Sequence, residues 1–353
     1  MEYLKNINDK LKKINEENVT YINLMEHPEF FYGNVNFSDT LVNFSKVPKK
    51  TREDITIYGK NVTKSMNDFH HASMGNRLRF ETNSKIVILK IKLRRKWGFI
   101  KILNWNGLGF DIYHVTEDGK YVHKTVFGPK DGYSTFAEKI HVPSNGKICI
   151  FLPSYNTVEQ IFLGFENNSQ IQPLEYPEPQ LPIIFYGNSV TQGSAASRSG
   201  NCFPNIVSRT LNKDIINLSV TNCCKGLLGM ARMIGKLNCE AIIIDYTRNA
   251  TDKEMFDKSY ERFYKLLRKY HPNKLIILMT SSCYNYWPMC DEFDKIVLNT
   301  FNKAIENGDN TKLLNQRELF DDDEYDLVAV DSAHYTDYGM FKVANKICEM
   351  LTK

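Results

Sequence analysis

A short apolar run that ends in a glycine- and serine-containing turn is the feature that most constrains the fold of this chain. Residues 181–185 form the apolar run, and Tyr186-Gly187-Asn188-Ser189-Val190-Thr191-Gln192-Gly193 follows it directly. Because such a turn joins a buried strand to a helix, it places the Ser189 hydroxyl at the edge where open α/β sheets bind ligands. The sequence therefore predicts an α/β domain with Ser189 at that edge.

The rest of the second half alternates between apolar strands and amphipathic helices. The clearest helix carries large apolar residues at intervals of four, three, four and three, namely Phe256, Tyr260, Phe263, Leu267 and Tyr270. Thr251-Asp252-Lys253-Glu254 predicts a capping box at its start, and His271-Pro272 predicts its end. The expected strands are residues 182–186, 214–218, 241–246, 274–280 and 327–330. Near-continuous apolar strands that alternate with helices indicate a parallel sheet covered on both faces.

The first half instead has the short alternating strands of an all-β domain. The expected strands are residues 86–93, 110–115, 121–124, 148–152 and 161–165, with a hairpin turn at 116–120. This pattern predicts a β-sandwich, preceded by a short amphipathic helix at residues 4–14. Three prolines between residues 173 and 179 indicate an extended linker. The expected domains are 1–170, a linker at 171–181, and 182–353.

Composition narrows the classes of partner. With 353 residues and 42% hydrophobic content, the chain can form two cores, and no apolar run approaches a membrane span. A net charge of +4 from 45 basic and 41 acidic residues does not favour nucleic acid. The charged N-terminus lacks a secretory signal, and the eight cysteines form no C-x-x-C pair. We therefore expect a cytoplasmic protein with reduced thiols and no metal; the sequence carries no signal for an oligomeric state.

Polar residues follow several of the expected strands and supply the parts of an acyl-transfer site. Asp331 and His334 follow the last expected strand, and Ser189 follows the first. A serine hydroxyl needs a base to accept its proton, so His334 is the candidate base and Asp331 the group that orients it. The developing oxyanion needs donors already in place, and the candidates are the Ser189 N–H, the Asn249 side-chain amide and an N–H near Asn222.

These blocks together resemble the SGNH (GDSL-like) hydrolases. The first block is Gly187-Asn188-Ser189-Val190-Thr191-Gln192-Gly193, with Asn188 where the family usually has Asp; the later blocks are Asp245-x-x-x-Asn249 and Asp331-x-x-His334 followed by Gly339. Residues 195–200 resemble the branch with an added N-terminal β-sandwich, whose Gly-x-Asp-Leu-Tyr motif is matched by Gly109-Phe110-Asp111-Ile112-Tyr113.

The resemblance implies a flavodoxin-like three-layer α/β/α domain preceded by a jelly-roll-like β-sandwich. It also implies ester hydrolysis through an acyl-enzyme on Ser189, without metal or organic cofactor. A small acyl group, such as acetyl on a carbohydrate, is the implied substrate, so the expected partner is a small-molecule or oligosaccharide ester. Candidate substrate-binding residues beside the blocks are Asn188, Arg198 and Arg248.

One block departs from the family pattern. Where the family has a phrase such as Asn-Leu-Gly-Phe-Ser-Gly, this chain has Asn217-Leu218-Ser219-Val220-Thr221-Asn222, so Asn222 replaces the glycine whose N–H joins the oxyanion hole. Asparagine tolerates positive φ better than most residues, so its N–H can still point correctly. Gly226 is the fallback donor.

Three other interpretations of the chain stay open. One is a binding protein for a glycan or metabolite with weakened catalysis, which the departure at Asn222 favours. Another is a thioesterase that acts on an intracellular metabolite. A third uses residues 187–193 to bind the phosphates of a nucleotide, but this loop lacks G-K-[ST] and leaves Asp331 and His334 unexplained. His70-His71 lacks an evident third metal ligand.

Overall fold

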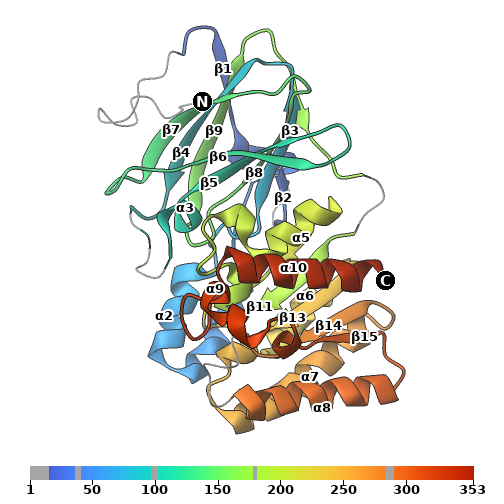
Figure 1. Cartoon of the computed structure of the whole chain (residues 1–353). Helices are drawn as coiled ribbons and strands as arrows, with labels where there is room; N and C mark the ends of the chain where they lie inside the picture. Colours follow the sequence, from blue (N-terminus) through green and yellow to red (C-terminus); the bar gives the residue numbers. More distant parts are fainter. Residues whose placement is uncertain (1–15, 36–40, 97, 99–101, 178–180, 283–289) are drawn as a thin grey trace. The chain divides into compact units, whose positions relative to one another are not determined.

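The computed structural model describes residues 16–35, 41–96, 98, 102–177, 181–282 and 290–353 (Figure 1). The chain forms two compact units that are not continuous in sequence. The first comprises Met1–Ser45, His71–Pro177 and Arg198–Gly200, and the second comprises Lys46–His70, Glu178–Ser197 and Asn201–Lys353. The helix expected at 4–14 lies outside the described residues. Domain limits at 170 and 182 stay a prediction.

The first unit contains two antiparallel sheets, as the sequence predicts. In the first sheet the strand order is β1 (Val19–Asn23), β9 (Val158–Glu166), β4 (Ile86–Leu93) and β7 (Thr135–His141). In the second sheet it is β10 (Ile171–Pro173), β3 (Arg77–Thr82), β8 (Lys147–Phe151), β5 (Phe110–Val115) and β6 (Tyr121–Phe127), and β2 (Phe31–Tyr32) also pairs with β3.

A shared apolar core joins the two sheets. Val87, Leu89 and Ile91 alternate along β4 and are buried in one cluster with Phe110 and Ile112 of β5. Side chains two residues apart in a strand point to the same face, so the alternation seen in the sequence is what fills this core.

The buried carboxylate of Asp111, on β5, binds the Arg198–Gly200 segment within the first unit. Its Oδ2 atom accepts hydrogen bonds from Arg198 Nη1 at 2.6 Å and from the Gly200 N–H at 2.9 Å. The His123 Nε2 atom lies 3.0 Å from Oδ1. A side chain at Gly200 would place its Cβ 2.3 Å from Asp111 Oδ2, so only glycine allows this approach.

The second unit is built on a parallel sheet of order β12-β11-β13-β14-β15. This is the flavodoxin-like order. The chain adds β12 on one side of β11 and the later strands on the other side, and ligands in such sheets bind beside this switch point. The strands are β11 (Ile183–Gly187), β12 (Ile215–Asn217), β13 (Ala241–Asp245), β14 (Leu275–Met279) and β15 (Thr311–Leu314).

Helices cover both faces of this sheet. Figure 1 shows α5 (Phe203–Leu211) and α10 (Asp337–Thr352) on one side, and α7 (Lys253–Tyr270) and α8 (Cys290–Glu306) on the other. The periodic apolar residues of α7 are buried up to Leu267, whereas Tyr270 is exposed. Its cap is Asp252 rather than Thr251, because the Asp252 carboxylate accepts the Met255 N–H at 2.8 Å.

A segment from early in the chain also belongs to this unit. It contains α1 (Lys49–Asp54), a 3₁₀ turn (Ile55–Tyr58) and α2 (Lys60–Phe69). The segment approaches α6 (Leu228–Ile234) closely, since a Cβ at Gly229 would lie 2.2 Å from Thr51 Oγ1.

The strand expected at residues 327–330 is wrong. Residues Tyr325–Val328 form a helical turn, α9, and the fifth strand is β15. Upstream, Asp321 and Glu324 form a capping box that starts helical turns, and Tyr325 and Val328, three residues apart, are buried. Asp331 therefore follows a helical turn, and an Ala329–Tyr335 bridge closes the loop that carries it.

The described part of the chain has neither a membrane-spanning helix nor a candidate metal site, and its cysteines are buried. None of its helices combines the length and the apolar character that a bilayer crossing requires. No group of three or more His, Cys, Asp or Glu side chains is arranged there to hold a metal ion. Seven described cysteines are buried and form no disulfide, namely Cys149, Cys202, Cys223, Cys224, Cys239, Cys290 and Cys348. Cys283 lies outside the described residues.

Replacing the Asp111 carboxylate should destabilise the protein strongly. In Asp111→Ala the Arg198 guanidinium and the Gly200 N–H lose their acceptor, and breaking one side of a buried charge pair costs roughly 3 kcal/mol. Urea denaturation of this variant should show that loss. The control is Glu117→Ala, whose exposed pairing with Lys147 should contribute less than about 1 kcal/mol. Equal stability of the two variants would contradict the anchoring role of Asp111.

Candidate active site

Ser189 lies where β11 gives way to the single-turn helix α4 (Ser189–Gln192). Asn188 caps this turn, because its Oδ1 atom accepts the Val190 N–H at 2.7 Å. Gly187 is required by close packing, since a Cβ there would lie 2.1 Å from Thr191 Oγ1 and 2.6 Å from the Asp245 carbonyl oxygen. Gly193 ends the turn with φ of 99°, a value that favours glycine.

The structure brings together the three residues that the sequence proposed as a triad. The Ser189 Oγ atom lies 2.8 Å from His334 Nε2, and His334 Nδ1 lies 2.9 and 3.0 Å from the two Asp331 oxygens. Because a carboxylate can only accept, Nδ1 carries the proton and Nε2 is left to accept the serine hydroxyl. The arrangement can thus remove a proton from Ser189.

Local hydrogen bonds keep Asp331 ionised and in place. Its Oδ1 atom also accepts the N–H groups of Ala333 at 2.8 Å and His334 at 2.9 Å. Partial burial acts to raise the pKa of Asp331, but the hydrogen bond and the charge of His334, with the two N–H donors, lower it overall. A carboxylate that stays charged orients the imidazole and stabilises the imidazolium.

Residues that follow two neighbouring strands hold the loop of His334. Arg248 Nη2 donates to the Ser332 carbonyl oxygen at 2.7 Å, and Ser282 Oγ donates to the Ala333 carbonyl oxygen at 3.0 Å. Of the candidate substrate-binding residues, Arg248 thus contacts the loop of His334, Asn188 caps α4, and Arg198 binds Asp111 in the first unit. Their contact with substrate stays a prediction.

The Asn249 side chain has the properties expected of an oxyanion donor. Asn249 ends a 3₁₀ turn (Thr247–Asn249) after β13 and is 6% exposed. Within the described residues, its Nδ2 group is buried without a hydrogen-bond acceptor. Buried donors are nearly always paired, so this amide is ready for an acceptor that a ligand would bring.

Asn222 adopts the backbone conformation that a glycine would otherwise supply. Its φ is 63°, in the left-handed region that asparagine tolerates. The preceding residue, Thr221, is fixed by Gln192, whose Oε1 atom accepts its N–H at 2.6 Å and its hydroxyl at 2.9 Å. The fallback donor, the Gly226 N–H, is already bonded to the Tyr186 hydroxyl at 3.3 Å. Asn222 therefore remains the stronger candidate.

The buried carboxyl of Asp245, which the sequence analysis named only as the start of the Asp245-x-x-x-Asn249 block and gave no role, connects these segments. Asp245 accepts from Thr191 Oγ1 at 2.6 Å and from Gln316 Nε2 at 3.3 Å, and Tyr335 donates to Gln316 at 2.8 Å. Burial raises the pKa of Asp245 to about 7, although these hydrogen bonds act to lower it. The position of Asp245 at a strand end was the one sequence feature that could have indicated its role. Its partners are distant in the sequence, so they could not be predicted from it.

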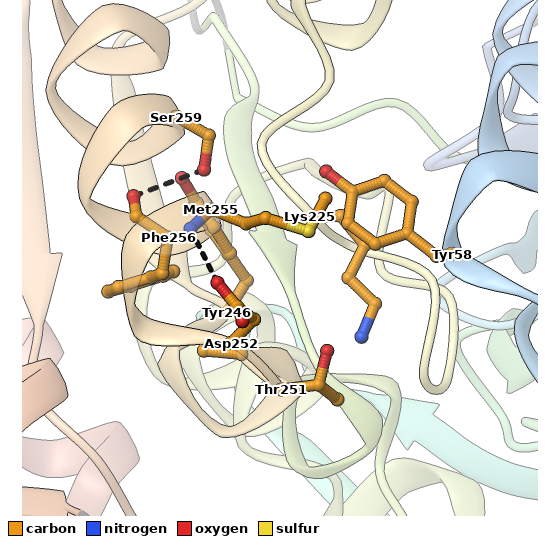
Figure 2. A pocket seen from close by; sticks show the side chains of 9 residues that line it. Tyr58, Lys225, Tyr246, Thr251, Asp252, Met255, Phe256 and Ser259 are labelled. Carbon is orange, nitrogen blue, oxygen red and sulfur yellow. Dashed lines mark hydrogen bonds between the residues drawn. The ribbon is translucent and has the colours of Figure 1, made fainter.

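A small pocket lies beside the Asn249 turn (Figure 2). Tyr58 and Lys225 line it opposite the first turns of α7, which contribute Met255, Phe256 and Ser259. Ser189, His334 and Asp331 do not line this pocket. The remaining lining residues are Tyr246, Ala250, Thr251 and Asp252.

Two family models match successive parts of the chain. The GDSL-like Lipase/Acylhydrolase family matches residues 180–352, and the GxDLY model, the N-terminus of SGNH-hydrolase-type esterases, matches residues 19–171. No protein of curated function shows a significant sequence match.

Several solved structures share the fold at low sequence identity. A putative GDSL-like lipase from Bacteroides ovatus superposes with a TM-score of 0.77 at 22% identity, covering 95% of this chain and 97% of the other. A salicylyl-acyltransferase from a tetracycline biosynthetic pathway gives 0.74 at 16% identity, with coverage of 94% and 96%. A family two carbohydrate esterase from Clostridium thermocellum, in complex with cellohexaose, gives 0.52 at 15% identity, with coverage of 78% and 90%.

Asp245→Asn should flatten the pH dependence of stability. Between the ordinary aspartate pKa of 3.8 and the folded value of about 7, the folded protein binds one more proton than the unfolded chain, so stability falls as the pH rises through this window. That difference in pKa corresponds to a loss of about 4 kcal/mol in the free energy of unfolding, which Asp245→Asn should not show.

Urea denaturation of both proteins at about pH 4 and about pH 8 measures this difference. Asp257→Asn, which removes an exposed carboxyl from α7, controls for the loss of one charge. Parallel pH profiles for wild type and Asp245→Asn would show that Asp245 is ionised in the folded protein throughout.

Proposed function

The chain belongs to the GDSL-like lipase/acylhydrolase family and has the N-terminal domain of SGNH-type esterases, and from this premise we propose that it is a serine esterase. The observation that carries the proposal is the hydrogen-bond chain from Ser189 through His334 to Asp331. Its geometry is that of a nucleophile, a base and an orienting carboxylate, each within hydrogen-bond distance of the next.

In the proposed reaction, Ser189 Oγ attacks the ester carbonyl carbon while its proton passes to His334 Nε2. The tetrahedral intermediate collapses as the imidazolium returns the proton to the leaving alcohol, which leaves an acyl group on Ser189. A water molecule then loses a proton to His334 and attacks the acyl carbon, and the acid departs as the proton returns to Ser189. Asp331 remains a carboxylate throughout and stabilises the imidazolium in both steps.

The oxyanion in each step would be held by three donors: the backbone N–H groups of Ser189 and Asn222 and the side-chain amide of Asn249. The unpaired, buried Nδ2 group supports the role of Asn249, and the left-handed backbone supports that of Asn222. Such donors accelerate the reaction because they are already in place when charge develops on the carbonyl oxygen.

A small acyl group, acetyl in the first instance, on a carbohydrate alcohol is the proposed substrate. The carbohydrate esterase among the structural neighbours supports an oligosaccharide ester as a test substrate. The acyltransferase neighbour makes an alcohol other than water a second acceptor to be tested for the acyl-enzyme.

The proposal predicts that hydrolysis of p-nitrophenyl acetate depends on Ser189. Ser189→Ala should lower kcat by roughly 10³-fold or more, because the reaction loses its nucleophile. Asn249→Ala should lower kcat by about 10²- to 10³-fold through the loss of one oxyanion donor. Steady-state kinetics on the purified variants, with acetylated sugars and longer acyl chains as further substrates, measures both effects.

The same assay has outcomes that would contradict the proposal. Equal activity of wild type and Ser189→Ala would exclude an acyl-enzyme on this residue. If neither protein turns over any ester, a fluorophosphonate probe decides the matter: labelling that requires Ser189 supports an activated serine with a narrower substrate, and absence of labelling favours a binding protein.

Substitutions at Asn222 test its backbone role separately from its side chain. Asn222→Gly should keep kcat within a few-fold of wild type, because glycine adopts positive φ freely. Asn222→Val should reduce kcat strongly, because a β-branched residue disfavours that conformation and would turn the N–H away. Similar kcat values for the Gly and Val variants would remove the Asn222 N–H from the proposed oxyanion hole.

A further inference from the structure

A buried lysine contacts the turn that carries Asn249. Lys225 is 5% exposed, and its Nζ atom donates a hydrogen bond to the Asn249 carbonyl oxygen. The same ammonium lies 5.7 Å from the centroid of the Tyr58 ring (Figure 2). Among the described residues, Lys225 forms no ion pair, so the carbonyl and the ring are its partners.

Burying this ammonium is costly, so its position needs a reason. Removal from water lowers the pKa of Lys225, because burial disfavours the charged form. The adjacent thiols of Cys223 and Cys224 do not supply a counter-charge, since burial raises the pKa of both, that of Cys224 to about 11, and keeps them neutral. Buried charges are normally paired, but among the described residues no carboxylate lies within ion-pair distance of Lys225, although Asp252 lines the same pocket.

The contact of Lys225 joins the two segments that carry the proposed oxyanion donors. Lys225 follows Asn222 by three residues in the same loop, and its side chain reaches the carbonyl of Asn249. The Asn249 turn is short: it has no side-chain cap, and the Asn249 N–H is bonded to the Tyr246 carbonyl oxygen at 2.9 Å. Lys225 thus fixes the backbone carbonyl of Asn249, the residue whose side-chain amide is unpaired.

We propose that Lys225 is a positioning residue of the oxyanion hole: its hydrogen bond to the Asn249 carbonyl oxygen holds the Asn249 amide where the oxyanion develops. Its uncompensated positive charge adds a field that favours negative charge at this position. Tyr58, from the early Lys46–His70 segment, covers the ammonium and keeps it from water. This inference rests on the proposed esterase function and extends it to a residue outside the catalytic blocks.

The proposal predicts a loss in kcat that depends on Asn249. Lys225→Met should lower kcat for p-nitrophenyl acetate by about tenfold or more, with KM changed less than about twofold, because the effect concerns the transition state. In an Asn249→Ala background, the same substitution should have little further effect, since the group that it positions is gone. Lys225→Arg keeps a charged donor and should retain most of the rate.

The matched control is Lys213→Met, which removes a half-buried lysine paired with Glu240 in the same unit. It should leave kcat unchanged in both backgrounds. Thermal unfolding checks that each variant is folded at the assay temperature. If Lys225→Met does not fold, Lys225→Ala, which also removes the donor and the charge, enters the same comparison with and without the Asn249 side chain.

Two results would overturn the inference while leaving the proposed function intact. One is an unchanged kcat in folded Lys225→Met, or in folded Lys225→Ala where the Met variant does not fold. The other is a fall in kcat by the same factor with and without the Asn249 side chain, which would mean that the lysine acts independently of Asn249. Failure of the proposed function has a different signature, because wild type would then be inactive or no more active than Ser189→Ala.

Discussion

The close approach of α4 to β13, which Gly187 allows, is the constraint on which the geometry of the candidate active site depends. Any side chain at residue 187 would overlap Thr191 and the Asp245 carbonyl oxygen. With that space free, the Asn188 N–H reaches the Asp245 carbonyl at 2.8 Å and Thr191 reaches its carboxyl at 2.6 Å. The serine turn is thereby bonded to the next strand of the sheet, and Ser189 is held at a fixed height above the strand ends.

Much of this arrangement was predictable from local sequence. The change from alternating strands to strand–helix alternation predicted both kinds of sheet, because side-chain period follows directly from backbone geometry. The position of Ser189 was predictable because strand ends in a parallel sheet meet at one edge. Asp331 and His334 were expected there for the same reason, but they follow a helical turn, so only their motif indicated their role. Residues 327–330 were misassigned because four apolar residues fit a strand or a helical turn equally well, and the capping box upstream decided the matter.

Other features depend on contacts between residues far apart in the chain, which periodicity does not encode. Nothing in residues 46–70 alone indicates that they join the second unit, since α2 buries Val62, Met66 and Phe69 as any amphipathic helix would. The hydrogen bond of Gln316 to the Asp245 carboxyl, and that of Lys225 to the Asn249 backbone carbonyl, join groups that are far apart in the sequence. Such pairs form only when the folded sheet brings these segments together, so the sequence alone does not predict them.

Asn222 shows how a residue other than glycine can hold a left-handed backbone conformation. The proposed oxyanion hole requires from this position only the direction of an N–H, which follows from backbone φ rather than from the side chain. That φ is set by the loop around it: Asn217 donates to the Thr191 carbonyl oxygen at 2.8 Å, and Gln192 binds Thr221. Because the loop is fixed from both sides, an asparagine can hold the left-handed conformation at modest cost, and its side chain then adds a polar group that glycine lacks.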